Sequence, residues 1–372
     1  MIRRFNPRYA LLPVTLFLGA CTTDSDESVT PVTVPDGGNT GFVATYQPDV
    51  ALMPFPTDAW RSGSTDGTLN IIEFDTNPLL SHVEQLNLLD GFGLNSPIWA
   101  DFSDPVDEET LVLGQTVFVF RVAVAGNAVP PTPVGSFDIG TAGFQGGRSV
   151  LELNPTAPLD PLTTYAVLVT AGVQSSDGIN ASADAAFQAM VDAFPADDTA
   201  SDSATVEAIY DGMVSSLLGL AEGAGIGADN VVAAWTFTTQ SISDSLALVE
   251  AMAAPQTNAI IPMGMTTADL NPALAGKADV YAGVIEMPYY LDPANPLTSF
   301  WEPVDASCAT AIGAGLIEEA SESTTVYCPL PEEQATVRVP VLITIPNGAS
   351  ATSTSAAQSA HSPVPTGATV CG

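Results

Sequence analysis

Residues 159–178 read LDPLTTYAVLVTAGVQSSDG, in which β-branched and aromatic residues crowd Thr164–Thr170 before an Asp-Gly pair at 177–178. This composition predicts a strand followed by a turn. Three earlier segments read as strands in the same way: 98–102, 116–124 and 149–153. Short strands at this spacing predict an Ig-like antiparallel β-sandwich over residues 46–180.

Helical patterns follow, and a helical segment with one strand is expected over residues 181–275. Ser182 is placed to cap a first helix that buries Phe187, Met190, Val191 and Phe194. The later elements are expected in this order: a longer helix from Val206 that ends at Gly223, a strand over 231–239 and a helix over 243–252. The predicted fold class is therefore mixed β and α.

Strand patterns return over residues 279–291 and 336–345, within a segment 276–346. They flank a loop that carries Cys308 and Cys328, which are expected to pair in an oxidising compartment. Such a bridge contributes roughly 3 kcal/mol. Residues 347–372 are rich in Ser, Ala, Thr and Pro and are expected to be a low-complexity linker or an aberrant tail.

The N-terminus predicts a bacterial lipoprotein signal peptide over residues 1–20. Three arginines precede an apolar run that is too short to span a bilayer. Leu18-Gly19-Ala20-Cys21 then places small residues before a cysteine, so Cys21 is the expected lipidation site. Residues 21–45 are largely small and polar and are expected to be a flexible tether. The expected location is the outer membrane or cell surface, with the lipid on Cys21 as the link to the membrane.

The chain is strongly acidic, with 42 Asp and Glu against 8 Lys and Arg and a formal net charge of −34. Removal of the signal peptide takes away basic residues but no acidic ones, so the mature chain is more negative still. This charge argues against nucleic acid as a partner.

Several segments together resemble the N-terminal region of the bacterial virulence-factor lipase family. They include VALMPFPTDAW at 50–60, LLDGFGLNSPIWADFSDPVD at 88–107, VVAAWTFTTQSI at 231–242, GVIEMPYYL at 283–291 and VRVPVLITIPN at 337–347. The likeness covers roughly residues 42–347. It implies an extracellular lipase or lysophospholipase lipoprotein whose catalytic half is an α/β-hydrolase domain. Residues 276–346 would then be the first strands of an incomplete α/β-hydrolase domain.

The chain contains no G-x-S-x-G motif and no His-Gly pair for an oxyanion loop. Its histidines are His82, in a predicted short helix, and His361, in the low-complexity tail, and neither is expected to be catalytic. We therefore expect no catalytic residue in this chain.

No metal site or cofactor is expected either. The acidic residues between Asp101 and Glu109 lack the regular oxygen spacing of a calcium loop, and a solvated acidic loop is the preferred interpretation. Gly223–Gly227 follows a helix and not a strand, so it is expected to end that helix and not to bind phosphate.

Three functional hypotheses follow. The first is the non-catalytic, lipid-anchored N-terminal accessory part of an extracellular lipase or lysophospholipase, which meets lipid substrate only if a hydrolase domain is supplied. The alternative is a standalone Ig-like cell-surface lipoprotein module that binds a partner. The third is a hydrolase with an unrecognised site.

Overall fold

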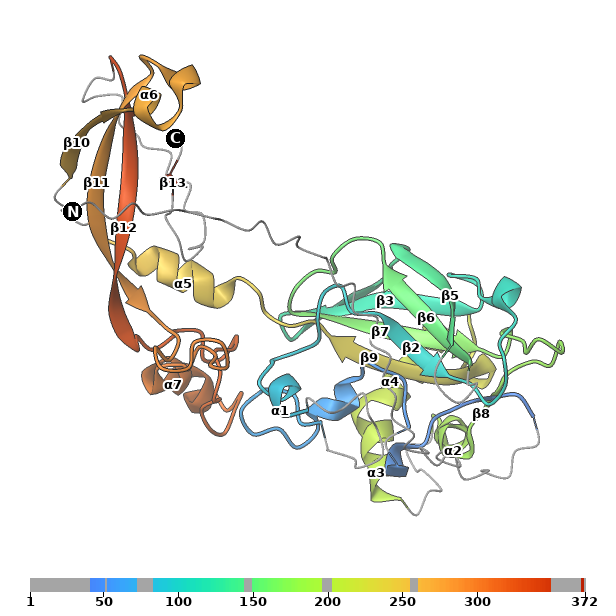
Figure 1. Ribbon diagram of the computed structural model, residues 1–372. Helices are drawn as coiled ribbons and strands as arrows, with labels where there is room; N and C mark the ends of the chain where they lie inside the picture. The colour runs from blue at the N-terminus through green and yellow to red at the C-terminus, as the bar shows by residue number, and fades with distance from the viewer. Residues whose placement is uncertain are drawn as a thin grey trace, which may run out of the picture. The chain divides into compact units, whose positions relative to one another are not determined.

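The computed structural model describes residues 41–50, 52–71, 83–143, 149–195, 203–254, 260–348 and 369–370. The signal peptide, Cys21, His82, His361 and most of the low-complexity tail lie outside these ranges. Within the described residues the fold is mixed, with several antiparallel sheets and helices (Figure 1).

Two antiparallel sheets form the predicted sandwich. The four-stranded sheet has the order β4 (Asn127–Pro133), β3 (Val117–Val124), β7 (Thr163–Thr170) and β9 (Val231–Thr238). The three-stranded sheet has the order β2 (Ile98–Asp101), β6 (Ser149–Pro155) and β5 (Phe137–Gly143). Strands β2, β3, β6 and β7 lie where the sequence predicts them, whereas β4 and β5 were not predicted.

Strand β7 forms the centre of the main core, and Tyr165–Val169 are each at most 3% exposed. Helix α4 (Ser215–Gly223) packs on β7 and β9, and α2 (Ala185–Ala193) packs on β9. A strand covered on both faces has a continuous apolar sequence, which explains the run in this segment. Each large apolar side chain fully buried here contributes about 1.5–3 kcal/mol.

Strand β9 pairs with β7 from Thr164↔Thr238 to Thr170↔Val231, although the helical segment separates the two in sequence. The sandwich therefore extends beyond the predicted boundary at residue 180. The intervening helices are α2, α3 (Ala204–Ile209) and α4, with a π-helical turn at Tyr210–Val214 between the last two. Helix α4 ends at Gly223, as predicted.

The N-terminal boundary also differs from the expectation. Phe42 is 2% exposed and stacks on Phe102, with ring centroids 5.0 Å apart. Strand β1 (Val43–Ala44) pairs in parallel with β8 (Ser182–Ala183). Residues 42–45 thus belong to the core and not to the tether.

The first helix is capped two residues later than predicted. Ser182 is held in β8, where its N–H and hydroxyl both donate to the Phe42 carbonyl. Asp184 is the N-cap of α2 and accepts a hydrogen bond from the Ala186 N–H. Phe187, Met190 and Val191 are buried as expected.

Short elements complete this part of the chain. They are the 3-10 turns η1 (Pro48–Val50), η2 (Asp58–Arg61), η4 (Glu108–Thr110) and η6 (Ala228–Asn230), and helix α1 (Val83–Leu86).

Another four-stranded sheet, separate from the sandwich, follows helix α5 (Asp244–Met252). It contains β10 (Ile261–Thr266), β11 (Ala278–Tyr289), β12 (Ala335–Pro346) and β13 (Thr369–Val370), with α6 (Thr267–Leu270) and η7 (Pro272–Leu274) after β10. Strands β11 and β12, expected to belong inside a parallel sheet, pair antiparallel over twelve residues. In this sheet, β13 runs parallel to β12, against Leu342 and Ile343.

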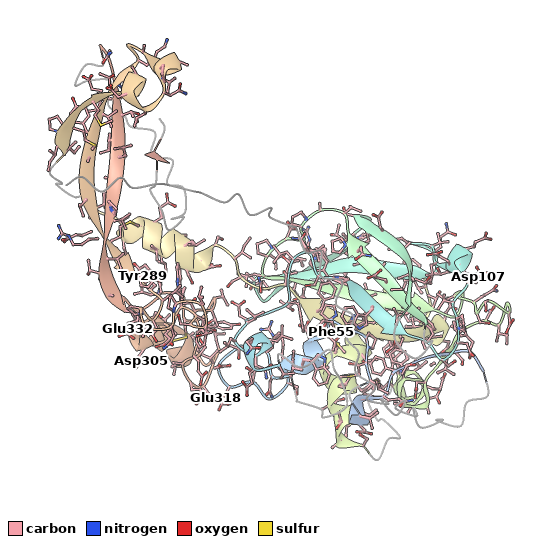
Figure 2. The ribbon with its side chains drawn as sticks, viewed as in Figure 1. Phe55, Asp107, Tyr289, Asp305, Glu318 and Glu332 are labelled. Atoms are coloured by element: carbon pink, nitrogen blue, oxygen red, sulfur yellow. A yellow bond between two sulfur atoms is a disulfide. The ribbon has the colours of Figure 1, made fainter. Side chains whose placement is uncertain are left out.

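The segment between β11 and β12, residues 290–334, forms what we call the disulfide lobe. It contains α7 (Asp305–Gly313) and a disulfide between Cys308 and Cys328. Asp305, Glu318 and Glu332 are labelled in this lobe in Figure 2. The lobe has a small apolar core of its own, made of Cys308, Ala311, Ile317 and Cys328.

Candidate functional site

The acidic residues near β2 are used for local structure. Asp107 caps η4 through the Glu109 N–H, at 3.1 Å, and Glu108 accepts a hydrogen bond from the Thr141 N–H, also at 3.1 Å. Among the described residues, no group of three or more His, Cys, Asp or Glu side chains is arranged to hold a metal ion.

Asp90 joins three segments that are distant in sequence. Its buried carboxylate accepts hydrogen bonds from the Ser241 N–H at 2.9 Å and the Val326 N–H at 2.7 Å. Arg61 donates to the Asp90 carbonyl at 3.0 Å.

The next residue, Gly91, lies close to the segment after β9. An added Cβ there would lie only 2.7 Å from the backbone of Thr239 and Gln240, so only glycine permits this close approach.

Further contacts hold the disulfide lobe against residues 65–88. The Glu318 N–H donates to the Thr65 carbonyl at 2.6 Å, and the Ser323 hydroxyl donates to the Leu88 carbonyl. A Cβ at Gly67 would lie 2.5 Å from the Tyr327 ring, so the ring rests against bare backbone. The lobe is thereby fastened to the segment that precedes β2. No sequence pattern predicts this attachment of the lobe, because backbone N–H and carbonyl groups, a hydroxyl and a glycine make the contacts.

One face of the β11–β12 pair is almost entirely apolar. The register and the alternation of side chains place twelve residues on it, including Asp279, Gly283 and Ala335. The other nine are large and apolar: Tyr281, Ile285, Met287 and Tyr289 of β11, and Val337, Val339, Val341, Ile343 and Ile345 of β12. We call this set the apolar sheet face. The opposite face is more polar and carries the Glu286–Arg338 ion pair at 3.5 Å.

The apolar sheet face is incompletely covered. None of its nine residues is buried, and Met287 is 46% exposed. Within the described ranges, the main core includes no residue after Phe237. Among the described residues, most exposed large apolar side chains lie after β9, but only Met287 of them is on the apolar sheet face. The others are spread over α5, β10, the turns after β10, the opposite sheet face and the disulfide lobe.

The carboxyl of Asp58, in η2, is buried against two threonines of β9. The Thr236 and Thr238 hydroxyls donate to Asp58 Oδ2 at 2.8 and 3.0 Å, while Asp58 Oδ1 has no hydrogen-bond partner. Burial raises the pKa of the Asp58 carboxyl, against the lowering effects of Arg61 and the two threonines. Because the Asp58 carboxyl is shielded from water and its Oδ1 has no hydrogen-bond partner, the charged form of Asp58 is disfavoured at this position.

The sandwich geometry agrees with a comparison to known families. Residues 75–190 match the bacterial Ig-like domain. The match runs from before β2 into α2, and the structure adds β9 to the same sheet. Domains of this family occur on bacterial surface proteins, so the Ig-like domain indicates a cell-surface module.

No curated protein matches the chain, and no match connects it with a lipase family. In the part of the chain that the structure describes, no helix has both the length and the apolar character needed to cross a membrane.

Proposed function

We propose that the chain is the lipid-anchored accessory part of an extracellular lipase or lysophospholipase. In this proposal Cys21 carries the lipid at the outer membrane or cell surface, and the Ig-like domain lies between the anchor and the catalytic domain in sequence. The lipase assignment is supported by the sequence resemblance over residues 42–347, and the surface location by the Ig-like domain.

The observation that carries the proposal is the apolar sheet face. Covering a sheet face lined by β-branched side chains removes apolar surface from water and is therefore favourable. An α/β-hydrolase domain would provide such a cover, and large α/β sheets commonly carry antiparallel strands at one edge. The parallel pairing of β13 with Leu342 and Ile343 supports the view that the outer edge of β12 accepts a parallel strand.

Under this proposal the chain supplies no catalytic group. Its contribution is positional: Asp90 and the disulfide lobe fasten the β11–β12 pair beside the Ig-like domain, and the pair then receives the catalytic domain. Lipid substrate is bound and cleaved only when that domain is present.

The test compares the recombinant mature chain with the protein isolated from its own cell envelope. The envelope protein should release fatty acid from a lysophospholipid, and its β12 amides should exchange hydrogen more slowly than in the recombinant chain. Equal exchange in both samples, with no fatty acid released by either, would refute the lipase proposal.

Lipid anchoring is tested separately by metabolic labelling with palmitate in a bacterial host. The wild-type chain and Cys371→Ser should carry label in the membrane fraction, whereas Cys21→Ser should not. Label on Cys21→Ser would contradict the anchor without bearing on the lipase assignment.

A second candidate is a standalone surface module that binds a protein partner. The observation that favours it is the Ig-like match, which involves no catalytic domain. It predicts that the envelope protein has the mass of the mature chain and no hydrolase activity, while the apolar sheet face is still protected there.

A further inference from the structure

The outer face of the three-stranded sheet carries a tryptophan beside polar side chains. In β2 the buried side chains alternate with Trp99, which is half-exposed on the face away from the core. Trp99 lies directly across from Glu152 of β6, and Glu152 lies across from Gly140 of β5. Residues that pair across neighbouring antiparallel strands point to the same face, so these three form one row across the sheet.

Phe55, labelled in Figure 2, extends this row on the other side of β2. Its N–H donates to the Trp99 carbonyl at 2.9 Å, and its ring stacks on the indole with ring centroids 4.9 Å apart. The buried ring of Phe92 packs edge-on against Phe55, with centroids 5.5 Å apart. Packing thus fixes one face of the indole, and the opposite face is directed toward Glu152.

A second carboxylate lies at the far end of the row. A Cβ added to Gly140 would lie only 2.9 Å from Glu108 Oε1, so the missing side chain leaves room for that carboxylate. The Thr141 N–H donates to the same oxygen at 3.1 Å and fixes its position. The Trp99 row therefore combines an aromatic ring with two carboxylates.

The next row adds further polar groups. Asn154 of β6 and Asp138 of β5 pair directly across from each other, and both are exposed. On the other side of the Trp99 row Val150 is buried, so the open area extends from Trp99 toward Asn154. None of the residues of β2, β5 and β6 is Lys or Arg. We call Trp99, Glu108, Asp138, Glu152 and Asn154 the outer sheet site.

The charge and spacing of these groups restrict the class of ligand. An anion would be repelled by the three carboxylates and by the formal net charge of −34. A small cation needs acceptors that converge on one point, whereas these are spread over two rows about 7 Å apart along the strands. The Asn154 amide also provides N–H donors, which a cation does not use.

A neutral sugar ring fits both parts of the site. A pyranose with equatorial hydroxyls presents a flat C–H face, which packs on the negative face of an aromatic ring, and hydroxyls at its edge, which bond carboxylate and amide groups. We propose that the outer sheet site binds a neutral β-linked glucan, with one ring stacked on Trp99 and its hydroxyls on Glu152 and Glu108. This proposal does not depend on the lipase assignment.

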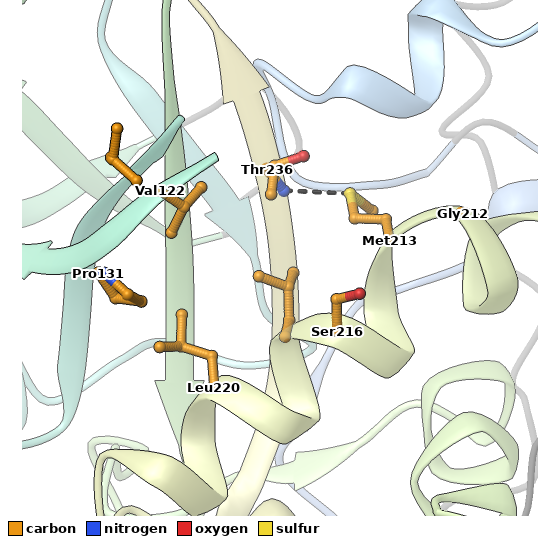
Figure 3. A pocket seen from close by; sticks show the side chains of 9 residues that line it. Val122, Pro131, Gly212, Met213, Ser216, Leu220 and Thr236 are labelled. Atoms are coloured by element: carbon orange, nitrogen blue, oxygen red, sulfur yellow. Dashed lines mark hydrogen bonds between the residues drawn. The ribbon is translucent and has the colours of Figure 1, made fainter. Parts of the chain in front are cut away.

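The hollow of about 250 Å³ beside α4 has a different chemistry (Figure 3). No charged side chain lines it, and the Thr236 hydroxyl and N–H there already donate to Asp58 and to the Met213 sulfur. It therefore has few groups for the hydroxyls of a sugar, in contrast to the outer sheet site.

The test is calorimetric titration of the mature chain with cellohexaose, a neutral β-1,4-linked glucan. Saturable binding is expected, with little dependence on salt because the ligand carries no charge. The glucosamine hexaose of the same linkage, titrated with its amines protonated, is the cationic comparison. Absence of saturable cellohexaose binding would overturn the proposal, and binding of the glucosamine hexaose alone would show that the site selects cations instead.

Matched tryptophan variants locate the site. Trp99→Leu removes the ring and keeps an apolar side chain, and it should weaken cellohexaose binding about tenfold or more, since an aromatic contact and its buried area are lost. Trp301→Leu makes the same change in the disulfide lobe, where Trp301 is also half-exposed and packs on Tyr290. This control should bind like the wild type.

An exposed polar position provides a second variant if Trp99→Leu unfolds at a lower temperature than the wild type. Asn154→Ala changes only an exposed side chain and should weaken binding about threefold, the effect of one hydrogen bond. Wild-type affinity in both Trp99→Leu and Asn154→Ala would show that the glucan binds elsewhere and would overturn the assignment.

Discussion

The carboxylate of Asp90 accepts a hydrogen bond from the backbone N–H of Val326 at 2.7 Å, across 236 positions of sequence. Its other oxygen bonds the Ser241 N–H, so one buried side chain ties the disulfide lobe to the end of β9. Hydrogen bonds to a charged acceptor are among the stronger ones in proteins. This carboxylate is therefore a buried polar link between the lobe and the sandwich, beside the hydrogen bonds to the Thr65 and Leu88 carbonyls.

Replacing Asp90 should release the lobe and leave the sandwich folded. Asp90→Ala removes two charge-assisted hydrogen bonds and leaves two N–H groups unpaired, so lobe docking should weaken by about 3 kcal/mol. Hydrogen exchange of residues 318–328 should accelerate, while that of β7 stays slow. Asp90→Asn is the control and should have a smaller effect, because it keeps one acceptor oxygen. Unchanged exchange in Asp90→Ala would refute the role of the carboxylate.

Reduction of the disulfide should loosen the lobe selectively. The bridge closes a loop with a sequence separation of 20, worth about 3 kcal/mol, and the lobe core is separate from the main core. The double variant Cys308→Ser with Cys328→Ser should therefore be cleaved by protease within 290–334 while a fragment containing β2–β9 survives. Simultaneous loss of both parts would show that they form one cooperative unit.

Asp58 should make stability depend on pH. Burial raises its folded-state pKa above the ordinary value of 3.8, so it favours the folded state at low pH, and this contribution is lost as pH rises through the folded pKa. Asp58→Asn removes the titration but keeps an acceptor for the Thr236 and Thr238 hydroxyls. Between acid and neutral pH the free energy of unfolding should fall more steeply in the wild type than in Asp58→Asn. Parallel pH profiles would contradict the raised pKa.

A charge on the apolar sheet face should be tolerated by the isolated chain. Val339 is half-buried on that face, so Val339→Lys should change the free energy of unfolding of the sandwich by less than about 0.5 kcal/mol. It should also lower self-association and the binding of an apolar dye. The control Thr336→Lys lies on the opposite face and should change neither. Strong destabilisation by Val339→Lys would mean that the face is already packed.

Local patterns were sufficient to predict much of the sandwich. The run at Tyr165–Val169 is continuous in the sequence because both faces of β7 are covered, and the apolar spacing of the long helix marks the side that packs on the sheet. Strand β4 escaped prediction because its prolines resemble a loop, and only an edge position makes them compatible with a sheet. The N-cap of α2 is Asp184 and not the predicted Ser182, because Ser182 pairs with β1 and bonds the Phe42 carbonyl, 140 residues away in sequence.

The candidate surfaces depended on pairing that a single sequence does not reveal. Residues 279–291 and 336–345 were predicted as strands, but their antiparallel register places the valines and isoleucines of β12 on one face with Tyr281 and Ile285. Asp90 entered the sequence analysis only as a member of the segment 88–107, and its partners Ser241 and Val326 are defined by tertiary structure. The Cys308–Cys328 pairing followed from loop length and compartment, and the structure contains that bridge.

The proposed cooperation of this chain with an α/β-hydrolase domain is tested by the nucleotide sequence of the locus beyond codon 372. We expect a reading frame, in phase or shifted, that encodes a His-Gly pair, a G-x-S-x-G motif and a late histidine in that order. A long stretch that encodes none of these in any frame would contradict it.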